Sequence, residues 1–394
     1  MFENLRAQPE DQILKLMEQY RADQRPEKID LGVGVYRNSQ GVTPVMQAVK
    51  SAEHQLWESQ QTKGYTGLAG DPAFVSAMSD LVLGTDLAQA RRAGAATVGG
   101  TGAIRQGLEL IRLARPDATV HVPDPTWPNH TAILQAMGMK HRTYRYFDTE
   151  TGALDMTGML EDLAAVPEGD VVLLHGCCHN PTGADPSAAQ WAQIAATLQQ
   201  VNAMVMVDIA YQGFGDGIEE DAAATRLLAS KLPELVIAVS CSKNFGLYRD
   251  RAGAVLVVSL SARHSAAVQG NLATLNRLAY SFPADHGAAL VQMILSNPGL
   301  RGEWMDELTA MRDRINTLRT ELAAALQRET GSDRFAFIGA QRGMFSRLGI
   351  TPDQVDTLRD AHAVYMVGDS RMNIAGLSME QIPTLARAIA DTCD

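Results

Sequence analysis

The sequence predicts an α/β protein in which a mostly parallel central sheet is flanked by helices, with a smaller α+β domain beside it. The first observation is that short apolar runs rich in β-branched residues alternate with helical segments from Thr43 onward, as in successive βαβ units. The second is that a long helical segment beginning near Arg301 is followed by mixed strands and helices. The length of 394 residues also favours two domains over one.

Each element follows from the local pattern of the chain. Residues 11–21 form an amphipathic helix pattern, and the glycine-punctuated segment 29–36 follows as an extended stretch. Buried strands are expected at 95–98, 119–122, 141–146, 171–174, 204–207, 236–240 and 254–258. A long helix at 301–328 precedes a strand at 335–338, a helix at 352–361, a strand at 363–367 and a terminal helix at 382–393. We therefore predict an arm at 1–10, a large domain at 44–311, and a small domain formed by 11–43 together with 312–394.

Composition excludes several classes of protein. Hydrophobic residues make up 46% and charged residues 20%, as in an ordinary globular protein, and the net charge of −11 argues against a nucleic-acid-binding surface. No apolar run approaches the roughly 18 residues of a membrane span and no signal pattern opens the chain, so we expect a cytoplasmic protein with no membrane contact. The four cysteines do not form a disulfide framework, and Cys177-Cys178-His179 lacks a second ligand pair, so no metal is expected.

The most informative stretch is the strand 236–240 and the lysine that follows it, Lys243. Ammonium groups are costly to bury, and burial lowers the pKa of a lysine toward neutrality. Such an amine is a nucleophile that forms Schiff bases with carbonyl compounds, pyridoxal phosphate included. The alternative is a strand-end lysine that extends its ammonium group to solvent.

Glycines follow another strand. Gly99-Gly100-Thr101-Gly102 opens a helix, where backbone N–H groups and the helix dipole favour a phosphate. The same stretch resembles half of a dinucleotide fingerprint with Asp124 downstream, but Arg105 occupies the third glycine position.

Other strand ends carry groups that suit an aromatic cofactor ring. Asp208 could pair with a protonated pyridine nitrogen, Tyr211 and Asn180 could reach a ring hydroxyl, and Trp127 offers a stacking face. Arg251 could hold a phosphate. Asp208 could instead cap a turn, and Trp127 could be a core residue.

Taken together, the chain resembles the class I (aspartate-type) aminotransferases, and the spellings YSFP and GMFSRLG look most like the aromatic-amino-acid enzymes of their bacterial branch. The resemblance spans nearly the whole chain. Its motifs are LGVGVY from Leu31, YTGLAG from Tyr65, GGTGA from Gly99, DPTWPNH from Asp124, HGCCHNPTG from His175, DIAYQGFGDG from Asp208, SCSKNFGLYRDR from Ser240, RGMFS from Arg342 and DSRMNIAG from Asp369.

The resemblance implies fold type I of the pyridoxal phosphate-dependent transferases and a ping-pong transamination through a Lys243 aldimine and a pyridoxamine phosphate intermediate. Lys243, Asp208 and Tyr211 match the catalytic residues, Asn180 matches a second group at the ring oxygen, and Trp127 matches the stacking residue. The residues that match the phosphate site are Gly100, Thr101, Ser240, Ser242 and Arg251.

Two matched residues imply a homodimer whose active sites are shared across the interface. Tyr65 matches a phosphate ligand, and Arg277 matches the arginine for a side-chain carboxylate, both supplied by the other subunit. Further substrate-binding positions that match are Gly34, Trp127, Asn180 and Arg371, the last for the α-carboxylate, and His130 and His175 match residues behind the aspartate.

Substrate preference depends on departures from the aspartate-specific pattern. Phe282 and Gly64 stand where those members often have Asn, and Arg347 replaces a phenylalanine. We therefore expect amino transfer between tyrosine, phenylalanine, tryptophan or aspartate/glutamate and 2-oxoglutarate, with Arg277 swinging out for aromatic rings. The alternative is an enzyme narrowly specific for aspartate.

Other classes fit less of the chain. Ser240-Cys241-Ser242-Lys243 matches Ser-x-x-Lys, the acyl-enzyme motif of β-lactam-binding proteins, but Ser-Asp-Asn and Lys-Thr-Gly are missing. A nicotinamide dehydrogenase would leave Lys243 without a role, and a non-catalytic binding protein on the same fold would not need it.

Overall fold

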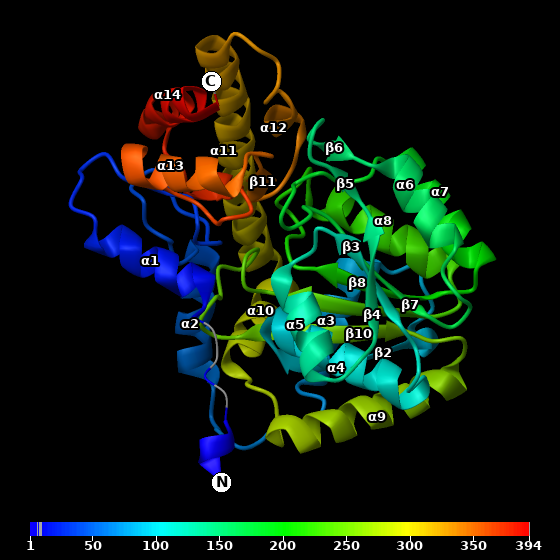
Figure 1. The fold of residues 1–394 in the computed structure, drawn as a ribbon. Helices are drawn as coiled ribbons and strands as arrows, with labels where there is room; N and C mark the ends of the chain where they lie inside the picture. The colour runs from blue at the N-terminus through cyan, green and yellow to red at the C-terminus, as the bar shows by residue number, and fades with distance from the viewer. Residues whose placement is uncertain (6, 8–9, 394) are drawn as a thin grey trace.

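The computed structural model of the protein describes residues 1–5, 7 and 10–393. Figure 1 shows the strands of the main sheet gathered in one body, with α13 (Pro352–His362) and α14 (Ile382–Cys393) beside the far end of the long helix α11 (Pro298–Thr330). The predicted arm includes residues 6, 8 and 9, which lie outside the described residues. Its described part contains the short 3-10 helix η1 (Phe2–Asn4).

The main sheet of the described chain has seven strands in the order β2-β10-β9-β8-β7-β3-β4. Their bounds are β2 (Arg92–Val98), β3 (Val120–Asp124), β4 (His141–Arg145), β7 (Val171–His175), β8 (Met204–Ile209), β9 (Leu235–Ser240) and β10 (Ala252–Val258). All the predicted strands of this sheet are confirmed, with ends that shift by a few residues. The mostly parallel arrangement is also confirmed, because only β10 runs antiparallel to its neighbours within the described sheet.

Both faces of the sheet are buried along its inner strands, which explains why strands such as β7, β9 and β10 read as continuous apolar runs. On β8, Val205 and Val207 point into one core cluster and Met206 into the other. Helix α4 (Gly99–Ala114) packs on the Met206 face, and Gly107 permits the contact because a Cβ there would lie 2.9 Å from Val236 Cγ1.

Helices cover the two faces separately. Residues of α4, α5 and α9 join the Met206 cluster, whereas residues of α3, α7, α8 and α10 join the other. The remaining elements of this body are α2 (Gln47–Ser59), α3 (Pro72–Leu83), η2 (Gln89–Arg91), α5 (Pro128–Ala136), β5 (Phe147–Asp148), β6 (Ala153–Leu154), α6 (Met156–Ala164), α7 (Ala188–Gln200), α8 (Ile218–Lys231), α9 (Ala262–Tyr280) and α10 (His286–Ser296). No helix in the described part of the chain combines the length and apolar character that a membrane crossing needs.

The long predicted helix is confirmed as α11. The Asn297 side chain accepts hydrogen bonds from Gly299 N and Leu300 N at its start, and Gly331, with φ of 63°, ends it in the left-handed region. Beside it lie β1 (Ile29–Asp30), α12 (Phe337–Ala340), β11 (Phe345–Arg347), β12 (Val364–Tyr365), β13 (Arg371–Asn373), η3 (Ile374–Gly376) and η4 (Met379–Gln381). The strands pair as β1 with β12 and β11 with β13.

The strand predicted at 335–338 is wrong, because this stretch leads into the short helix α12. Its backbone bonds are local, from Ala336 N to Asp333 O and from Ile338 N to Phe335 O. Phe335 is buried all the same, and a short apolar run does not distinguish a buried strand from a buried helical turn. In the segment 29–36, only Ile29 and Asp30 form a strand.

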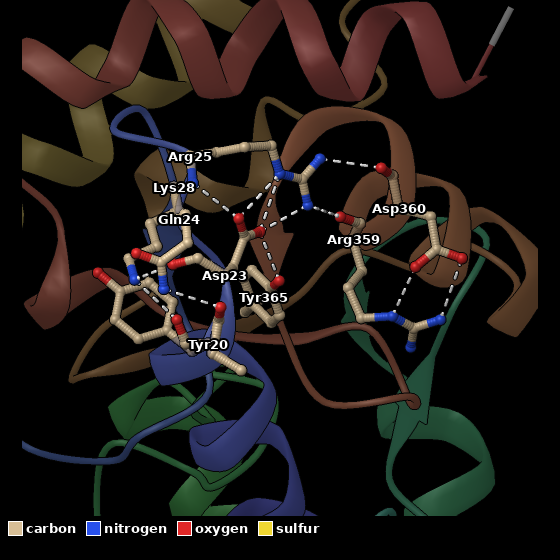
Figure 2. A network of polar contacts seen from close by, with 9 residues as sticks. Tyr20, Asp23, Gln24, Arg25, Lys28, Arg359, Asp360 and Tyr365 are labelled. Atoms are coloured by element: carbon tan, nitrogen blue, oxygen red, sulfur yellow. Dashed lines mark hydrogen bonds and ion pairs between the residues drawn. The ribbon is translucent and has the colours of Figure 1, made fainter.

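The predicted first helix is confirmed as α1 (Gln12–Ala22), capped by Asp11. A polar network, drawn in Figure 2, fastens its end to α13 and β12. Arg25 pairs with Asp23 at 2.6 Å and donates to Asp360 O, while the Tyr365 hydroxyl donates to Asp23 at 2.6 Å. This network and the pairing of β1 with β12 favour the grouping of 11–43 with 312–394, which we keep as a proposal.

Candidate active site

The carboxyl ends of the parallel strands converge on one cavity of about 250 Å³. In the sheet register, His175 on β7 lies beside Asp208 on β8, and Asp208 lies beside Ala238 on β9. The cavity lining includes most of the predicted site residues: Gly34, Gly100, Thr101, Trp127, Asn180, Asp208, Tyr211, Ser240, Ser242, Lys243, Arg251 and Arg371. Tyr65 and Arg277 are not among the residues that line it.

Lys243 is buried at the end of β9. Burial lowers the pKa of its ammonium group from 10.5 to about 8; the Asp208 carboxylate opposes this shift and the Arg251 charge adds to it. Its Nζ lies 4.8 Å from the centre of the Tyr211 ring. About half of this amine is therefore neutral near pH 8, and the neutral form can act as a nucleophile or a general base.

The turn after Lys243 is held in place by α11. The indole nitrogen of Trp304 donates to Asn244 O at 2.6 Å, and the rings of Trp304 and Phe245 stack with centroids 4.6 Å apart. Gly246 closes the turn with φ of 65° and donates its N–H to Lys243 O. The backbone of Lys243 is thereby fixed against α11 through the fully buried Trp304.

Asp208 stays ionised although it is buried. Burial alone would raise its pKa, but the hydrogen bond with His130 and the nearby Lys243 ammonium group outweigh that effect and lower the pKa below its usual value. The carboxylate therefore offers a negative charge inside the cavity, where a protonated ring nitrogen would pair with it.

A chain of hydrogen bonds supports Asp208 from behind. His130 Nε2 lies 3.1 Å from Asp208 Oδ2, and Thr126 Oγ1 lies 2.8 Å from His130 Nδ1 and 3.1 Å from His175 Nε2. Burial lowers the pKa of His175 to about 3, so this imidazole is neutral. Thr126 was missed in the sequence, although its position four residues before His130 at the start of a helix was a usable signal.

An anion cradle lies at the N-terminus of α4. A Cβ at Gly99 would lie 2.5 Å from Arg251 Nη2, and one at Gly100 would lie 2.8 Å from Ser240 Cβ, so both glycines keep this space open. Arg251 Nη1 donates to Tyr248 O at 3.0 Å and lies 3.4 Å from Ser242 Oγ. The N–H groups of the first helical turn, the serine and threonine hydroxyls and the Arg251 guanidinium together suit a phosphate group.

Arg371 enters the cavity from β13. It donates weakly, at 3.4 Å, to Asn180 Oδ1 and to Gly32 O, and its Nε has no hydrogen-bond partner within the described part of the chain. Its guanidinium carbon lies 4.8 Å from the centre of the Phe345 ring. Burial lowers the pKa of this group, and a carboxylate ligand would satisfy its remaining donors.

Two aromatic groups complete the cavity. Burial, followed by the Asp208 charge, raises the pKa of Tyr211, so its hydroxyl remains a hydrogen-bond donor. Trp127 packs edge to face on His130, with ring centroids 5.3 Å apart. Cavity residues that the sequence analysis did not assign to this site are Ile13, Ile104, Cys177, Ala210, Tyr248 and Phe345.

Tyr65 and Arg277 lie together elsewhere on the surface of the chain. The Tyr65 side chain is 86% exposed and stacks on Phe282, with ring centroids 4.6 Å apart. Arg277 Nη1 donates to Ser281 Oγ at 2.8 Å. Within one chain these two residues do not reach the cavity.

Cys177, Cys178 and Asp221 bring possible ligand atoms within 4.8 Å of one another. However, the Asp221 carboxylate already accepts N–H groups from Gly213, Gly215 and Asp216. The hydrogen bond with Cys178 acts to lower the pKa of Cys177, but burial and the nearby carboxylates of Asp221, Asp185 and Asp208 together outweigh it and raise that pKa to about 12. Protonated thiols, and a carboxylate that already accepts three backbone N–H groups, do not favour metal binding.

Comparison with known proteins agrees with this geometry. Residues 26–389 match the family model for aminotransferases of class I and II. The chain is 55% identical over 391 residues to the aromatic-amino-acid aminotransferase of Paracoccus denitrificans, covering 99% of each chain, and 44% identical over 393 residues to the aspartate aminotransferase of Haemophilus influenzae, again covering 99% of each. A crystal structure of the aromatic-amino-acid aminotransferase from Burkholderia pseudomallei, covalently bound to pyridoxal phosphate, superimposes with a TM-score of 0.97 at 40% identity, covering all of both chains.

The predicted resemblance and fold type are therefore confirmed: the chain belongs to the class I and II aminotransferases, enzymes of fold type I that use pyridoxal 5′-phosphate to move amino groups between amino acids and oxo acids.

Proposed function

We propose that the protein transfers the amino group of aromatic amino acids, and of aspartate or glutamate, to 2-oxoglutarate. The observation that carries this proposal is one cavity that combines a buried amine of lowered pKa, an ionised carboxylate and a buried guanidinium with an unsatisfied donor. The 55% identity to an aromatic-amino-acid aminotransferase supports the aromatic part.

The residues of the cavity fit pyridoxal phosphate. When bound, the cofactor supplies an aldehyde and an electron-accepting ring. We assign its phosphate to the cradle formed by Gly100, Thr101, Ser240, Ser242 and Arg251. Asp208 would hold a proton on the ring nitrogen, Tyr211 and Asn180 would donate to the ring oxygen, and Trp127 would cover one ring face.

The same cavity orients the substrate. Arg371 would take the α-carboxylate in a bidentate pair, which satisfies its open Nε, and Gly34 would lie beside it. The neutral Lys243 Nζ would remove the proton from the substrate α-carbon. A pKa of about 8 leaves this amine able both to accept and to return a proton near neutral pH.

We further propose a homodimer with shared active sites. Tyr65 and Arg277 would serve the neighbouring subunit, Tyr65 at the phosphate and Arg277 at the side-chain carboxylate of aspartate or glutamate. Arg277 would swing away for an aromatic ring, because an apolar ring cannot satisfy a guanidinium. The cytoplasm stays the expected location.

The second candidate is an enzyme narrowly specific for aspartate, which the 44% identity to an aspartate aminotransferase supports. Steady-state kinetics with phenylalanine and aspartate as donors and 2-oxoglutarate as acceptor distinguish the two. We expect kcat/KM for the two donors to lie within about a hundredfold, a difference of less than 3 kcal/mol. A value for phenylalanine thousands of times lower would establish the narrow enzyme instead.

Arg277→Ala sharpens this comparison. We expect the variant to lose most of its activity with aspartate and to keep much of its activity with phenylalanine, because only the dicarboxylate pairs with the guanidinium. Equal losses with both donors would contradict the role proposed for Arg277.

A further inference from the structure

Tyr65 and Arg277 come from distant parts of the sequence and meet over one aromatic ring, that of Phe282. The Tyr65 ring lies nearly parallel to it, at 15° and 4.6 Å between centroids. The Arg277 guanidinium carbon lies 5.9 Å from the same centroid, within the range of a cation–π contact. Phe282 therefore touches both groups that this chain would offer to a neighbouring subunit.

The backbone that carries Phe282 is held in a costly conformation. Ser281 has φ of 69° and ψ of −62°, and Phe282 N donates across it to Tyr280 O at 2.8 Å, which makes a γ-turn with positive φ. A serine rarely adopts this geometry, and strain of this kind persists where the surroundings enforce it, often at functional sites. The Ser281 hydroxyl accepts the hydrogen bond from Arg277. The same turn therefore fixes the backbone of Phe282 and the side chain of Arg277.

A fully buried amide anchors this turn to the loop that carries Tyr65. Asn276 Nδ2 donates to Leu68 O and to Ala96 O, both at 3.0 Å, and its Oδ1 accepts from the Tyr280 hydroxyl at 2.6 Å. The end of α9, the loop after Tyr65 and strand β2 are thus tied together beneath the exposed Tyr65 ring and the half-buried Phe282 ring. Against this fixed base, the stack on Phe282 is the contact that orients the Tyr65 side chain.

We propose that Phe282 is a positioning residue: its ring holds Tyr65 in the orientation in which the phenol hydroxyl reaches the phosphate bound by a second copy of the chain. This inference rests on the proposed function and on its shared site. It gives position 282, where aspartate-specific members often have Asn, a physical role, since an amide has no ring face on which a phenol can stack.

The test is the rate at which the holoenzyme releases pyridoxal phosphate, followed by absorbance during dilution into a cofactor trap. We expect Phe282→Leu to speed release by about 2- to 12-fold, the effect of losing one aromatic pair. Phe282→Tyr, which keeps a stacking ring, should restore slow release. Phe147→Leu, which removes a partly buried ring far from this cluster, is the matched control. Release from Phe282→Leu at the wild-type rate would overturn the proposal.

A double-mutant cycle shows whether Phe282 acts through Tyr65. Tyr65→Phe keeps the ring and the stack but removes the hydroxyl, so adding Phe282→Leu to it should change the release rate little. An undiminished effect of Phe282→Leu in that background would also overturn the proposal. The proposed function fails in a different way, if the wild-type holoenzyme transfers no amino group from phenylalanine or aspartate, and the release rates remain interpretable in that case.

Discussion

Thr126 joins the two histidines behind Asp208 through a single hydroxyl. The hydroxyl is hydrogen-bonded both to the neutral His175 and to His130, which in turn is bonded to Asp208. It therefore fixes the orientation of both rings. Buried polar atoms that lose their only partner carry the full cost of desolvation. The residue therefore matters through the groups that it satisfies rather than through any contact with substrate.

Removing this hydroxyl should destabilise the protein. We expect Thr126→Val to lower the free energy of unfolding by about 1–3 kcal/mol, because His130 Nδ1 and His175 Nε2 lose a partner in a buried place. Urea denaturation measures the change. Thr131→Val, which removes an exposed bond to Pro128 O, is the control and should cost less than Thr126→Val.

The lowered pKa of Lys243 predicts how its reactivity depends on pH. In protein stripped of cofactor, the rate of reductive alkylation at Lys243 by a small aldehyde should rise with pH and reach half its maximum near pH 8, because only the neutral amine reacts. Asp208 raises this pKa and Arg251 lowers it. Asp208→Asn should therefore move the midpoint to lower pH and Arg251→Gln to higher pH. Shifts of the opposite sign would show that these charges do not act on the amine as the geometry indicates.

At the scale of the elements, the main sheet was predictable because both of its faces are buried. A strand such as β9 then reads as an unbroken apolar run, Val236 to Val239, and its end locates Lys243. The strands β11 and β13 were not predicted, since each has three residues and their arginines and asparagine resemble a loop. The error at 335–338 has a related cause, because Phe335 and Ile338 are buried by tertiary contacts that no short pattern encodes.

The turn from β2 into α4 offers a test with a control in the same helical turn. Gly100→Ala should weaken pyridoxal phosphate binding at least about tenfold, because its Cβ would lie 2.8 Å from Ser240 Cβ inside the anion cradle. Gly102→Ala places its Cβ in ordinary contact, 3.4 Å from Thr97 Cβ, and should bind nearly as well as wild type. Cofactor titration followed by tryptophan fluorescence compares the two, and equal affinities would contradict the close packing of this turn.

At the scale of the whole molecule, one chain brings most of the predicted site residues to one cavity, but not Tyr65 and Arg277. Residues that line the cavity come from strand ends, from β13 and from the segment with Gly34, and the roles proposed for them follow from the resemblance. What the sequence could not provide is the support around them. Phe345 and the Asn276 anchor act through contacts between segments far apart in the chain, and only the folded structure shows such contacts. Thr126 contacts His130 four residues away, but its bond to His175 also joins distant segments.

The proposed shared active sites predict that two inactivated variants complement each other when they form mixed dimers. Lys243→Ala chains and Arg277→Ala chains each have little or no activity with aspartate, and activity should return when the two are dissociated together and reassembled. A mixed dimer then holds one complete site, so about a quarter of all sites recover for a random two-fold dimer. Mixing without dissociation is the control. If reassembled mixtures stay inactive with aspartate, Arg277 does not act across a subunit interface.

The most direct measurement concerns Lys243 itself. Protein incubated with pyridoxal phosphate is reduced with sodium borohydride, digested and mapped by mass spectrometry, alongside Lys243→Ala. In the wild-type protein we expect one pyridoxyl adduct, on Lys243. In Lys243→Ala we expect no adduct on any lysine. A wild-type map without an adduct at Lys243, or with the same adducts as the variant, would contradict the role of this amine and the function built on it.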